Sequence, residues 1–305
     1  MSEDEEPGFV VMHVQADDND AWGLNKEVVY SIVNGNVANT FGIDQKNGKI
    51  MLNSGLDRES IKDYNLTIMA QDRGTQPRNS TIVVSILVRD VNDQVPYFSQ
   101  SEYHVTLAES YPSDTAFLKI NASDNDEGAN AKLYFAITSG NEEGLFIMNA
   151  GTGEMVIMPN EHLDYEHSPF HKLVVRATDC TGCESDMPRY ANITTVYVNV
   201  TDVNEFPPVF PTTYIEGVNE NMDIDSQVFT AHANDKDSGY YGIVTYNLTG
   251  TKLFSIHYRT GIVTANQKFD YERAENRTFR FYIHATDIYR GPDRFCASGL
   301  KYSRC

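Results

Sequence analysis

Apolar and polar side chains alternate with a period of two over residues 64–70 of the chain. Such alternation is typical of a β-strand that buries one face. The inward face would carry Tyr64, Leu66, Ile68 and Ala70, and the outward face Asn65, Thr67 and Met69. The segments TIVVSILV (81–88) and TTVYVNV (194–200) are rich in β-branched residues, which favour strands. Turn residues separate these patterns, and no amphipathic helix of useful length interrupts them, so we predict an all-β chain of sandwiches of about 100 residues each.

One ordered set of motifs occurs three times along the chain. Each copy runs from a strand pattern into Asp-X-Asp, passes through a strand with a central tyrosine, and places a glycine seven residues after a phenylalanine. Asp-X-Glu and a strand ending in Ala-X-Asp then follow in the same order. The copies are Asp18/Asp20, Asp124/Asp126 and Asp235/Asp237; Tyr30, Tyr134 and Tyr246; Phe41/Gly48, Phe146/Gly153 and Phe254/Gly261; Asp57/Glu59, Asp164/Glu166 and Asp270/Glu272; and Asp72, Asp179 and Asp287.

This repetition predicts three domains, at residues 1–97, 98–209 and 210–305, with boundaries at the two Asp-Val-Asn segments. The third copy lacks a final strand pattern and its own Asp-Val-Asn, so we expect it to be incomplete at its C-terminal end.

Composition and charge narrow the class of protein. A hydrophobic content of 41% in 305 residues is enough for several cores, and no apolar run approaches the roughly 20 residues that a membrane-spanning helix needs. The net charge of -19 argues against nucleic acid as a partner and favours cations. Glycosylation signals of the form Asn-X-Ser/Thr favour secretion. They stand at Asn65, Asn79, Asn121, Asn192, Asn199, Asn247 and Asn276.

Four cysteines form two local pairs, Cys180 with Cys183 and Cys296 with Cys305. Three interpretations of the first pair stay open: a structural loop disulfide, a redox or zinc site, and unpaired thiols. Redox chemistry requires the first cysteine at a helix N-terminus, where the thiolate is stabilised, whereas the flanks here read as strand and turn. We therefore favour two local disulfides, formed in an oxidising compartment.

Acidic residues recur at five places in the repeat: a glutamate near its start (Glu3, Glu109 and Glu220), Asp-X-Asp, Asp-X-Glu, Ala-X-Asp and the Asp-Val-Asn segment. One such acid by itself would be a solvated turn residue. The recurrence of the whole set at strand ends points instead to a shared ligand. Gathered carboxylates raise one another's pKa values unless a cation neutralises them. Calcium takes about six to eight oxygen ligands, and this set offers only oxygens.

The linker segments DVNDQVP (90–96) and DVNEFPP (202–208) look like the cadherin motif Asp-X-Asn-Asp-X-Pro-Pro. Together with Asp-X-Asp, Asp-Arg/Tyr-Glu and Ala-X-Asp in fixed order, they make the chain resemble the cadherin family over essentially all of its length. The resemblance implies three tandem Greek-key β-sandwich domains in an elongated rod. It also implies about three Ca²⁺ ions at each junction between repeats, which make the linker rigid.

By this resemblance, the first junction holds one ion with Glu3, Asp57, Glu59 and Asp93, and a second with Glu3, Glu59, Asp90, Asp93 and Asp126. A third ion takes Asn92, Asp124, Asp126 and Asp179 with the carbonyls of Gln94 and Asn130, and the linker residue Val91 belongs to the same set. The second junction uses Glu109, Asp164, Glu166, Asp202, Glu205, Asn204, Asp235, Asp237 and Asp287, with the backbone positions Val203, Phe206 and Tyr241.

Two positions depart from the family pattern. Glu205 stands where the family has Asp, and its extra methylene can displace an oxygen. Tyr241 stands where the family has Asn, which matters little if only the carbonyl binds.

An enzyme is the rival class of function. Paired carboxylates perform general acid and base catalysis in glycosidases, and His162 and His167 flank one acidic pair. A catalytic pair belongs in one cleft, however, whereas these acids occur in three copies and the histidines have no recurring offset. We therefore predict that the chain is not an enzyme.

The resemblance implies a calcium-dependent adhesion and mechanical ectodomain segment, extracellular and at the cell surface, whose partners are other cadherin ectodomains in homophilic or heterophilic contact. A structural spacer without partner contact is the alternative. Trp22 follows Asp-X-Asp and so cannot serve as the N-terminal tryptophan of strand-exchanging cadherins.

Half-sets of acids at both ends of the chain indicate a soluble interior piece of a long, membrane-anchored cadherin of the Fat, Dachsous, protocadherin or tip-link kind. These half-sets are Asp18, Asp20 and Asp72, and Glu220, Asp270 and Glu272.

Overall fold

A computed structural model of the chain describes residues 1–20, 23–179, 189–214, 216–273 and 278–287. It forms two compact units. The first comprises Met1–Tyr103, Ala116–Val156 and Leu173–Val196, and the second comprises the described residues of His104–Thr115, Ile157–Lys172 and Tyr197–Cys305. All four cysteines, Trp22 and Asn276 lie outside the described residues, so the expectations that concern them are untested.

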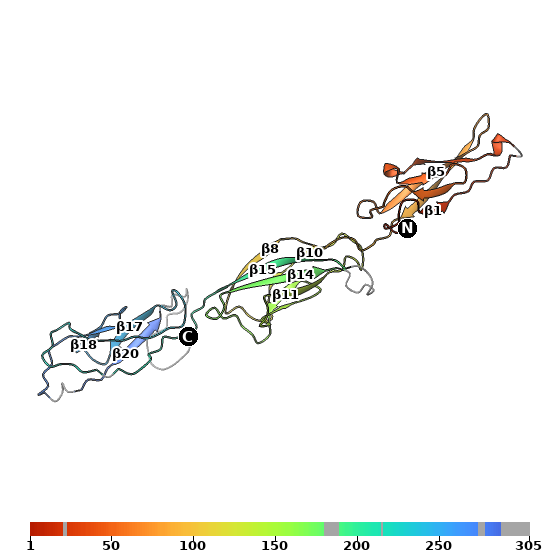
Figure 1. Cartoon of the computed structure of the whole chain (residues 1–305). Coiled ribbons are helices and arrows are strands. Elements are labelled where there is room, and N and C mark those ends of the chain that lie inside the picture. Colours follow the sequence, from red (N-terminus) through yellow and green to blue (C-terminus); the bar gives the residue numbers. More distant parts are fainter. Residues whose placement is uncertain (21–22, 180–188, 215, 274–277, 288–305) are drawn as a thin grey trace. The chain divides into compact units, whose positions relative to one another are not determined.

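The first repeat consists of two three-stranded sheets (Figure 1). One has the order β1-β4-β3, and the other has the order β2-β5-β6. Their bounds are β1 Val10–His13, β2 Val29–Asn34, β3 Phe41–Ile43, β4 Lys49–Leu52, β5 Asp63–Gln71 and β6 Asn79–Leu87. Helical structure in the described residues is confined to the short 3₁₀ turns Leu24–Lys26 and Val37–Asn39. The prediction of an all-β chain is therefore confirmed.

The predicted alternation along β5 decides which side chains enter the core. Leu66 and Ile68 are almost fully buried, and Asn65 is exposed. The core contains residues from both sheets, and Phe41 of β3 meets Tyr64 of β5 edge to face with ring centroids 5.0 Å apart. Because well-packed apolar side chains such as Leu66 each contribute about 2–5 kcal/mol, this core holds the first repeat together without any acidic residue.

The second repeat carries the same two sheets in longer form. One has the order β11-β14-β15-β8, the other has the order β12-β13-β9, and β7 pairs with β10. The bounds are β7 Tyr97–Phe98, β8 Glu102–Ala108, β9 Ala116–Lys119, β10 Ala122–Ser123, β11 Tyr134–Ser139, β12 Phe146–Met148, β13 Glu154–Ile157, β14 Phe170–Thr178 and β15 Ala191–Thr201. Leu173 and Val175 of β14 are completely buried.

In the third repeat the described residues form the sheet β16-β19-β18 and the pair β17-β20. The bounds are β16 Gln227–Thr230, β17 Val244–Thr249, β18 Phe254–Ile256, β19 Ile262–Ala265 and β20 Tyr282–Asp287. Aromatic rings dominate its core: Phe254 lies 5.2 Å from Phe269 and 5.1 Å from Phe281 between ring centroids.

The glycine that follows each Phe by seven residues has a conformational cause. Gly48, Gly153 and Gly261 all have positive φ, at 67°, 72° and 68°. A Cβ on any of them would collide with the carbonyl oxygen of a facing residue, which is Val14 for Gly48. The backbone amide of Val14 in turn donates to the carbonyl of Gly48 at 2.9 Å. Only glycine fits this close antiparallel approach.

One expected equivalence is wrong. We expected Tyr134 to match Tyr30 and Tyr246 as the central residue of its strand. Tyr134 is 48% exposed, however, and the neighbouring Phe135 is buried. The amide of Phe135 donates to a loop carbonyl as those of Tyr30 and Tyr246 do. Because side chains alternate faces along a strand, a one-residue shift moved the assignment to the wrong face.

Candidate metal centres

A buried glutamate ties together two backbone segments in both of the first two repeats. The carboxylate of Glu3 accepts the amide of Arg58 at 2.7 Å and the amide of Val91 at 2.7 Å. Glu109 likewise accepts the amide of Tyr165 at 2.8 Å and the amide of Val203 at 2.6 Å. In the third repeat, Glu220 accepts the amide of Tyr271 at 3.2 Å. Glu3 and Glu109 thus fix the Asp-X-Glu motif next to the linker.

The Asp-X-Asp motif folds into the same turn each time. The first aspartate accepts the amide of the second through Oδ1, at 3.0 Å for Asp124 and Asp126 and at 3.0 Å for Asp235 and Asp237. Such local side-chain bonds are characteristic of aspartate in turns. The second aspartate also meets the linker: Asp126 accepts the amide of Gln94 at 3.4 Å.

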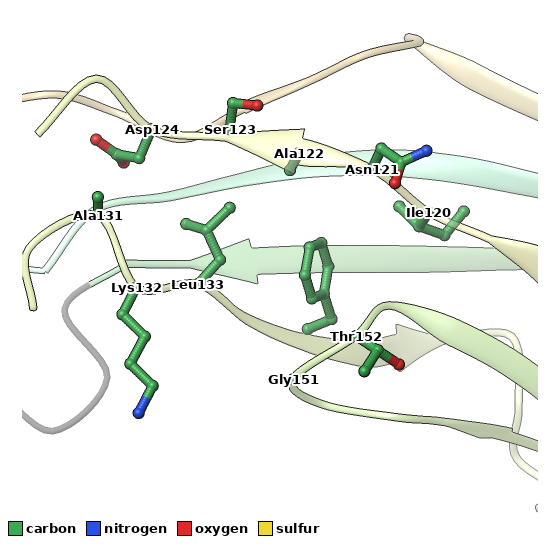
Figure 2. A pocket seen from close by; sticks show the side chains of 11 residues that line it. Ile120, Asn121, Ala122, Ser123, Asp124, Ala131, Lys132, Leu133, Gly151 and Thr152 are labelled. Atoms are coloured by element: carbon green, nitrogen blue, oxygen red, sulfur yellow. The ribbon is translucent and has the colours of Figure 1, made fainter. Parts of the chain in front are cut away.

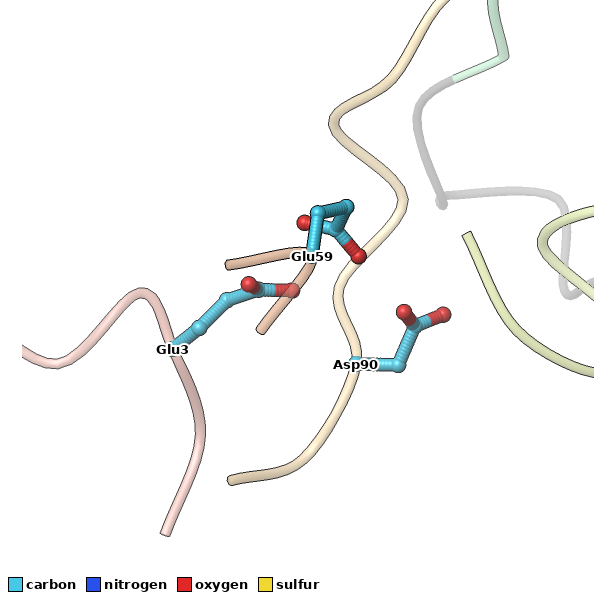
Figure 3. Close-up of side chains that lie close together, drawn as sticks. All are labelled: Glu3, Glu59 and Asp90. Carbon is cyan, nitrogen blue, oxygen red and sulfur yellow. The ribbon is translucent and has the colours of Figure 1, made fainter. Parts of the chain in front are cut away.

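Acids and one asparagine from five segments of the first unit gather at this place. We call this group the first acidic centre; it comprises Glu3, Asp57, Glu59, Asp90, Asn92, Asp93, Asp124, Asp126 and Asp179. Carboxylate oxygens of Glu3, Glu59 and Asp90 lie within 4.8 Å of one another (Figure 3), and so do those of Glu59, Asp93 and Asp126. The sequence-predicted acids of this region therefore lie together.

An equivalent group lies in the second unit. We call it the second acidic centre; it comprises Glu109, Asp164, Glu166, Asp202, Asn204, Glu205, Asp235 and Asp237. Oxygens of Glu109, Asp164 and Glu166 lie within 4.8 Å of one another, as do those of Glu166, Asp202 and Asp237. The amide of Phe206 donates to both oxygens of Asp237, at 3.3 Å and 3.2 Å. In both centres, therefore, a linker amide holds the second aspartate of Asp-X-Asp.

In each centre several carboxylates use one oxygen for a protein donor and leave the other buried and unsatisfied. Asp179 is fully buried; its Oδ1 accepts the amide of Tyr190 at 2.8 Å, and its Oδ2 has no hydrogen-bond partner among the described residues. Oδ1 of Asp90 also has no hydrogen bond in the described residues, but it forms an ion pair with Arg58. The other carboxylate oxygens without a partner are Oε2 of Glu59, Oδ2 of Asp124, Oδ1 of Asp126, Oδ2 of Asp179, Oδ1 of Asp202 and Oδ2 of Asp235. A buried anionic oxygen without a partner is costly, so these oxygens are candidate ligands for a cation.

The pKa values of three carboxylates in the first centre are raised by burial and by neighbouring acids. Burial, followed by repulsion from Asp124, raises the pKa of Asp126 to about 7. Burial and the charge of Asp179 raise the pKa of Asp124, although hydrogen bonds from backbone amides oppose the shift. Burial and the charge of Glu3 raise the pKa of Glu59. Without a cation, these carboxylates resist being charged together.

The pKa values of four carboxylates in the second centre are also raised. Burial is the main cause that raises the pKa of Glu166, Asp202, Glu205 and Asp237. Repulsion from Glu109 adds to the shift at Glu166, Asp202 and Glu205.

The donors of both centres fit calcium. They are carboxylates, side-chain amides and backbone carbonyls, which are the ligands that Ca²⁺ takes in flexible geometry. Within the described part of the chain, the members of both sets offer oxygen ligands, whereas zinc favours sulfur and nitrogen.

The remaining predicted positions are placed as follows. Asp57 is exposed, and its carboxylate accepts the amide and hydroxyl of Ser60, at 3.0 Å and 2.8 Å. Asn92 is buried, whereas Asn204 and Tyr241 are half-buried. Asp287 ends β20 and pairs with Val244 of β17.

Asp90 differs from the other acids because one of its oxygens lies in an ion pair and the other accepts hydrogen bonds. Its Oδ1 forms an ion pair with Nε of Arg58. Its Oδ2 accepts the amide of Glu127 at 2.9 Å and Nδ2 of Asn130 at 2.8 Å. Arg58, which is 2% exposed, was not among the site residues expected from the sequence. The only sequence signal was that the middle residue of Asp-X-Glu is Arg in the first repeat and Tyr in the others.

A third acidic group and an open pocket also occur among the described residues. Oxygens of Glu220, Asp270 and Glu272 also lie within 4.8 Å of one another, but all three residues are exposed. An open pocket of about 480 Å³ lies between Asp124 at one end and Thr152 at the other (Figure 2). Asp124 is the one acid among its lining residues, so this pocket lacks a converging set of oxygen donors.

Comparison with known proteins identifies the family. A family model described as "Cadherin domain" matches residues 1–89, 103–201 and 214–300. The chain belongs to the cadherin family. Cadherins are adhesion proteins and not enzymes, and the chain contains three cadherin repeats.

Relatives of this cadherin segment are much longer proteins. Mouse (Mus musculus) protocadherin-16 is 34% identical over 309 aligned residues, which cover 94% of this chain and 9% of the relative. The Fat-like cadherin-related tumor suppressor homolog of Drosophila melanogaster is 33% identical over 97% of this chain and 6% of the relative. The chain thus spans less than a tenth of the length of these curated relatives. The crystal structure of mouse cadherin-23 EC22-24 superposes with a TM-score of 0.77 at 30% identity and covers 94% of this cadherin and 89% of that chain.

None of the helices in the described residues of this cadherin has the length and apolar character to cross a membrane.

Proposed function

We propose that this cadherin segment binds Ca²⁺ at its two acidic centres and that the ions stiffen the two linkers, residues 90–96 and 202–208. The observation that supports this proposal is the set of buried carboxylate oxygens that have no hydrogen-bond partner in the described chain. On each of these residues the other carboxylate oxygen already accepts a hydrogen bond from the protein. A bound ion would supply the positive charge that these oxygens lack. With about three ions per centre, each would be shared between the repeat and its linker.

Most of the residues expected from the sequence are proposed as ligands. In the first centre these are Glu3, Asp57, Glu59, Asn92, Asp93, Asp124, Asp126 and Asp179, with carbonyls of Val91, Gln94 and Asn130. In the second they are Glu109, Asp164, Glu166, Asp202, Asn204, Glu205, Asp235, Asp237 and Asp287, with carbonyls of Val203, Phe206 and Tyr241. We assign Asp90 a holding role instead, because Arg58, Glu127 and Asn130 already engage its oxygens.

The test is a calcium titration of the whole chain by isothermal calorimetry. Asp126→Asn and Asp237→Asn each remove one charge from one centre and should each weaken binding at that centre by tenfold or more, in line with the dependence of calcium affinity on ligand charge. Asp223→Asn is the matched control, because the Asp223 side chain is 85% exposed and pairs with Lys268. Equal titrations for all four proteins would refute the proposal.

We further propose that the segment acts outside the cell as part of a membrane-anchored adhesion protein, with other cadherin ectodomains as partners. The described glycosylation signals support this location, since Asn65, Asn79, Asn121, Asn192, Asn199 and Asn247 are all exposed. Cadherins associate with cadherins, which gives the class of partner. The molar mass of the chain in solution at millimolar calcium, alone and mixed with a candidate ectodomain, tests homophilic and heterophilic contact. A monomer in every mixture would favour a spacer.

A further inference from the structure

Arg58 places a positive charge inside the first acidic centre. Its Nε faces Oδ1 of Asp90, and its Nη2 donates to Oε1 of Glu59 at 2.6 Å. Nη2 also donates to the carbonyl of Asn125 at 3.1 Å, and Nη1 donates to Oε2 of Glu127 at 3.2 Å. A single buried guanidinium therefore joins the Asp-X-Glu motif, the linker and the Asp-X-Asp turn.

The charge of Arg58 is secure in this position. A guanidinium stays protonated in proteins, and here the carboxylates of Asp90 and Glu59 lie against it. Arginine also suits the position because its planar fork can donate to several acceptors at once. The pair with Glu127 contributes least, since that side chain is 67% exposed.

The second centre has the same backbone plan without this cation. Tyr165 occupies the position of Arg58, and its amide bonds Glu109 as that of Arg58 bonds Glu3. Asp202 is the counterpart of Asp90, because its Oδ2 accepts the amide of Ser238 at 3.0 Å. Its Oδ1, which would face the arginine, is buried without a hydrogen-bond partner in the described chain.

Two other side chains that can carry positive charge, Lys236 and His162, lie near the second centre. The ammonium of the exposed Lys236 stands 5.1 Å from the ring centroid of Phe206. His162 is exposed and acts on Glu205, whose pKa it lowers slightly against the larger effects of burial and neighbouring acids.

We propose that Arg58 is a resident counter-cation, which holds the first acidic centre together before calcium binds. The second centre has Tyr165 at the equivalent position and depends on the metal to offset the repulsion among its acids. This inference rests on the proposed function, since it concerns how two calcium centres of one chain differ. It follows from charge balance: without metal, the acids of the first centre repel one another, but the guanidinium of Arg58 attracts two of them, Glu59 and Asp90. In the second centre Tyr165 stands in place of this guanidinium.

Hydrogen exchange of the whole chain, read by mass spectrometry, tests the proposal. The readouts are the protection factors of the linker amides at residues 90–94 and 202–206, in excess chelator and in millimolar calcium. Without calcium, the first linker should be protected at least about tenfold more than the second, because losing one partner of a buried ion pair is strongly destabilising. Arg58→Tyr should abolish this difference, Arg58→Lys should keep part of it, and Tyr165→Arg should raise protection of the second linker.

Each outcome has one meaning. Protection of β5 reports that a variant has folded, and millimolar calcium should restore protection of residues 90–94 in Arg58→Tyr. If calcium protects both linkers of the parent but folded Arg58→Tyr matches the parent in chelator, the role of Arg58 is refuted and the calcium centres stand. If calcium protects neither linker of the parent, the proposed function fails and this inference fails with it.

Discussion

The carboxylate of Glu3 accepts the backbone amide of Val91 at 2.7 Å, although 88 positions separate the two residues in the sequence. Its second oxygen accepts the amide of Arg58. One side chain therefore closes the first repeat onto its own linker, and Glu109 does the same with Val203 in the second repeat.

Glu3→Ala should destabilise the first repeat even without calcium, because two backbone amides lose their acceptor. Each unsatisfied buried donor costs about 1–3 kcal/mol. Thermal unfolding in excess chelator measures the loss, and Glu6→Ala serves as the control because Glu6 is exposed. An unchanged unfolding temperature in Glu3→Ala would show that water replaces the carboxylate at no cost.

Removal of calcium should leave the β-structure intact. Cores such as the one around Leu66 contain no acidic residue, so the far-ultraviolet circular dichroism spectrum should be the same in chelator and in calcium. The unfolding temperature should still fall, because calcium at ten times its Kd stabilises the folded state by about 1.4 kcal/mol per site. A loss of strand signal on chelation at 25 °C would contradict this expectation.

Glu205 should weaken the second centre relative to the first. Glu205 and Asp93 hold the same linker position, and the longer side chain has one more rotatable bond to freeze, at about 0.5–1 kcal/mol. Glu205→Asp in the whole chain should therefore tighten calcium binding at the second centre by about threefold, Asp93→Glu should weaken the first, and Asp93→Ala should weaken it most. Calcium-dependent protection of residues 202–206 and 90–94 gives the two affinities separately. A Glu205→Asp variant no tighter than the parent would show that the longer side chain is accommodated.

Gly48→Ala should destabilise the first repeat far more than Gly55→Ala. Gly48 has a φ of 67°, and an added Cβ would meet the carbonyl of Val14, whereas the space around Gly55 is open. A non-glycine residue in this left-handed region costs about 1–3 kcal/mol before the collision is counted. Urea unfolding of the two variants measures the difference, and equal midpoints would count against the close approach.

The exposed glycosylation signals should carry sugar in a secreted form of the chain. Asn65, Asn79 and Asn247 lie on strands, and their side chains are exposed. Enzymatic removal of the glycans in heavy-oxygen water, followed by peptide mass spectrometry, counts the occupied sites. An unmodified chain from secreting cells would argue against an extracellular location.

Much of this organisation could be read from the sequence because it depends on local rules. Alternation along residues 64–70 fixed the buried face of β5, and the Phe-to-Gly spacing marked a turn that only glycine permits. The acids of Asp-X-Asp and Asp-X-Glu were found because they recur. The choice of Tyr134 over Phe135 failed because two adjacent aromatics in a strand leave the inward face undecided until the register is known.

The charge interactions within the two centres could not be predicted from the sequence by such local rules. Oδ1 of Asp90 forms an ion pair with Arg58, whereas Oδ1 of Asp202 is buried without a hydrogen-bond partner in the described residues. This difference depends on where the Arg58 side chain lies. A long side chain between two acids can point to solvent or inward, and the pattern of residue types is the same in both cases.

The separation of the first centre's residues along the chain has a consequence for biosynthesis. Its members begin at Glu3 and end at Asp179, which acts on Asp124. A ribosome must therefore release most of the second repeat before the centre for the first linker is complete, although the first core closes much earlier. Each repeat would leave the ribosome folded but with an unfinished acidic edge, and the next repeat along would finish it.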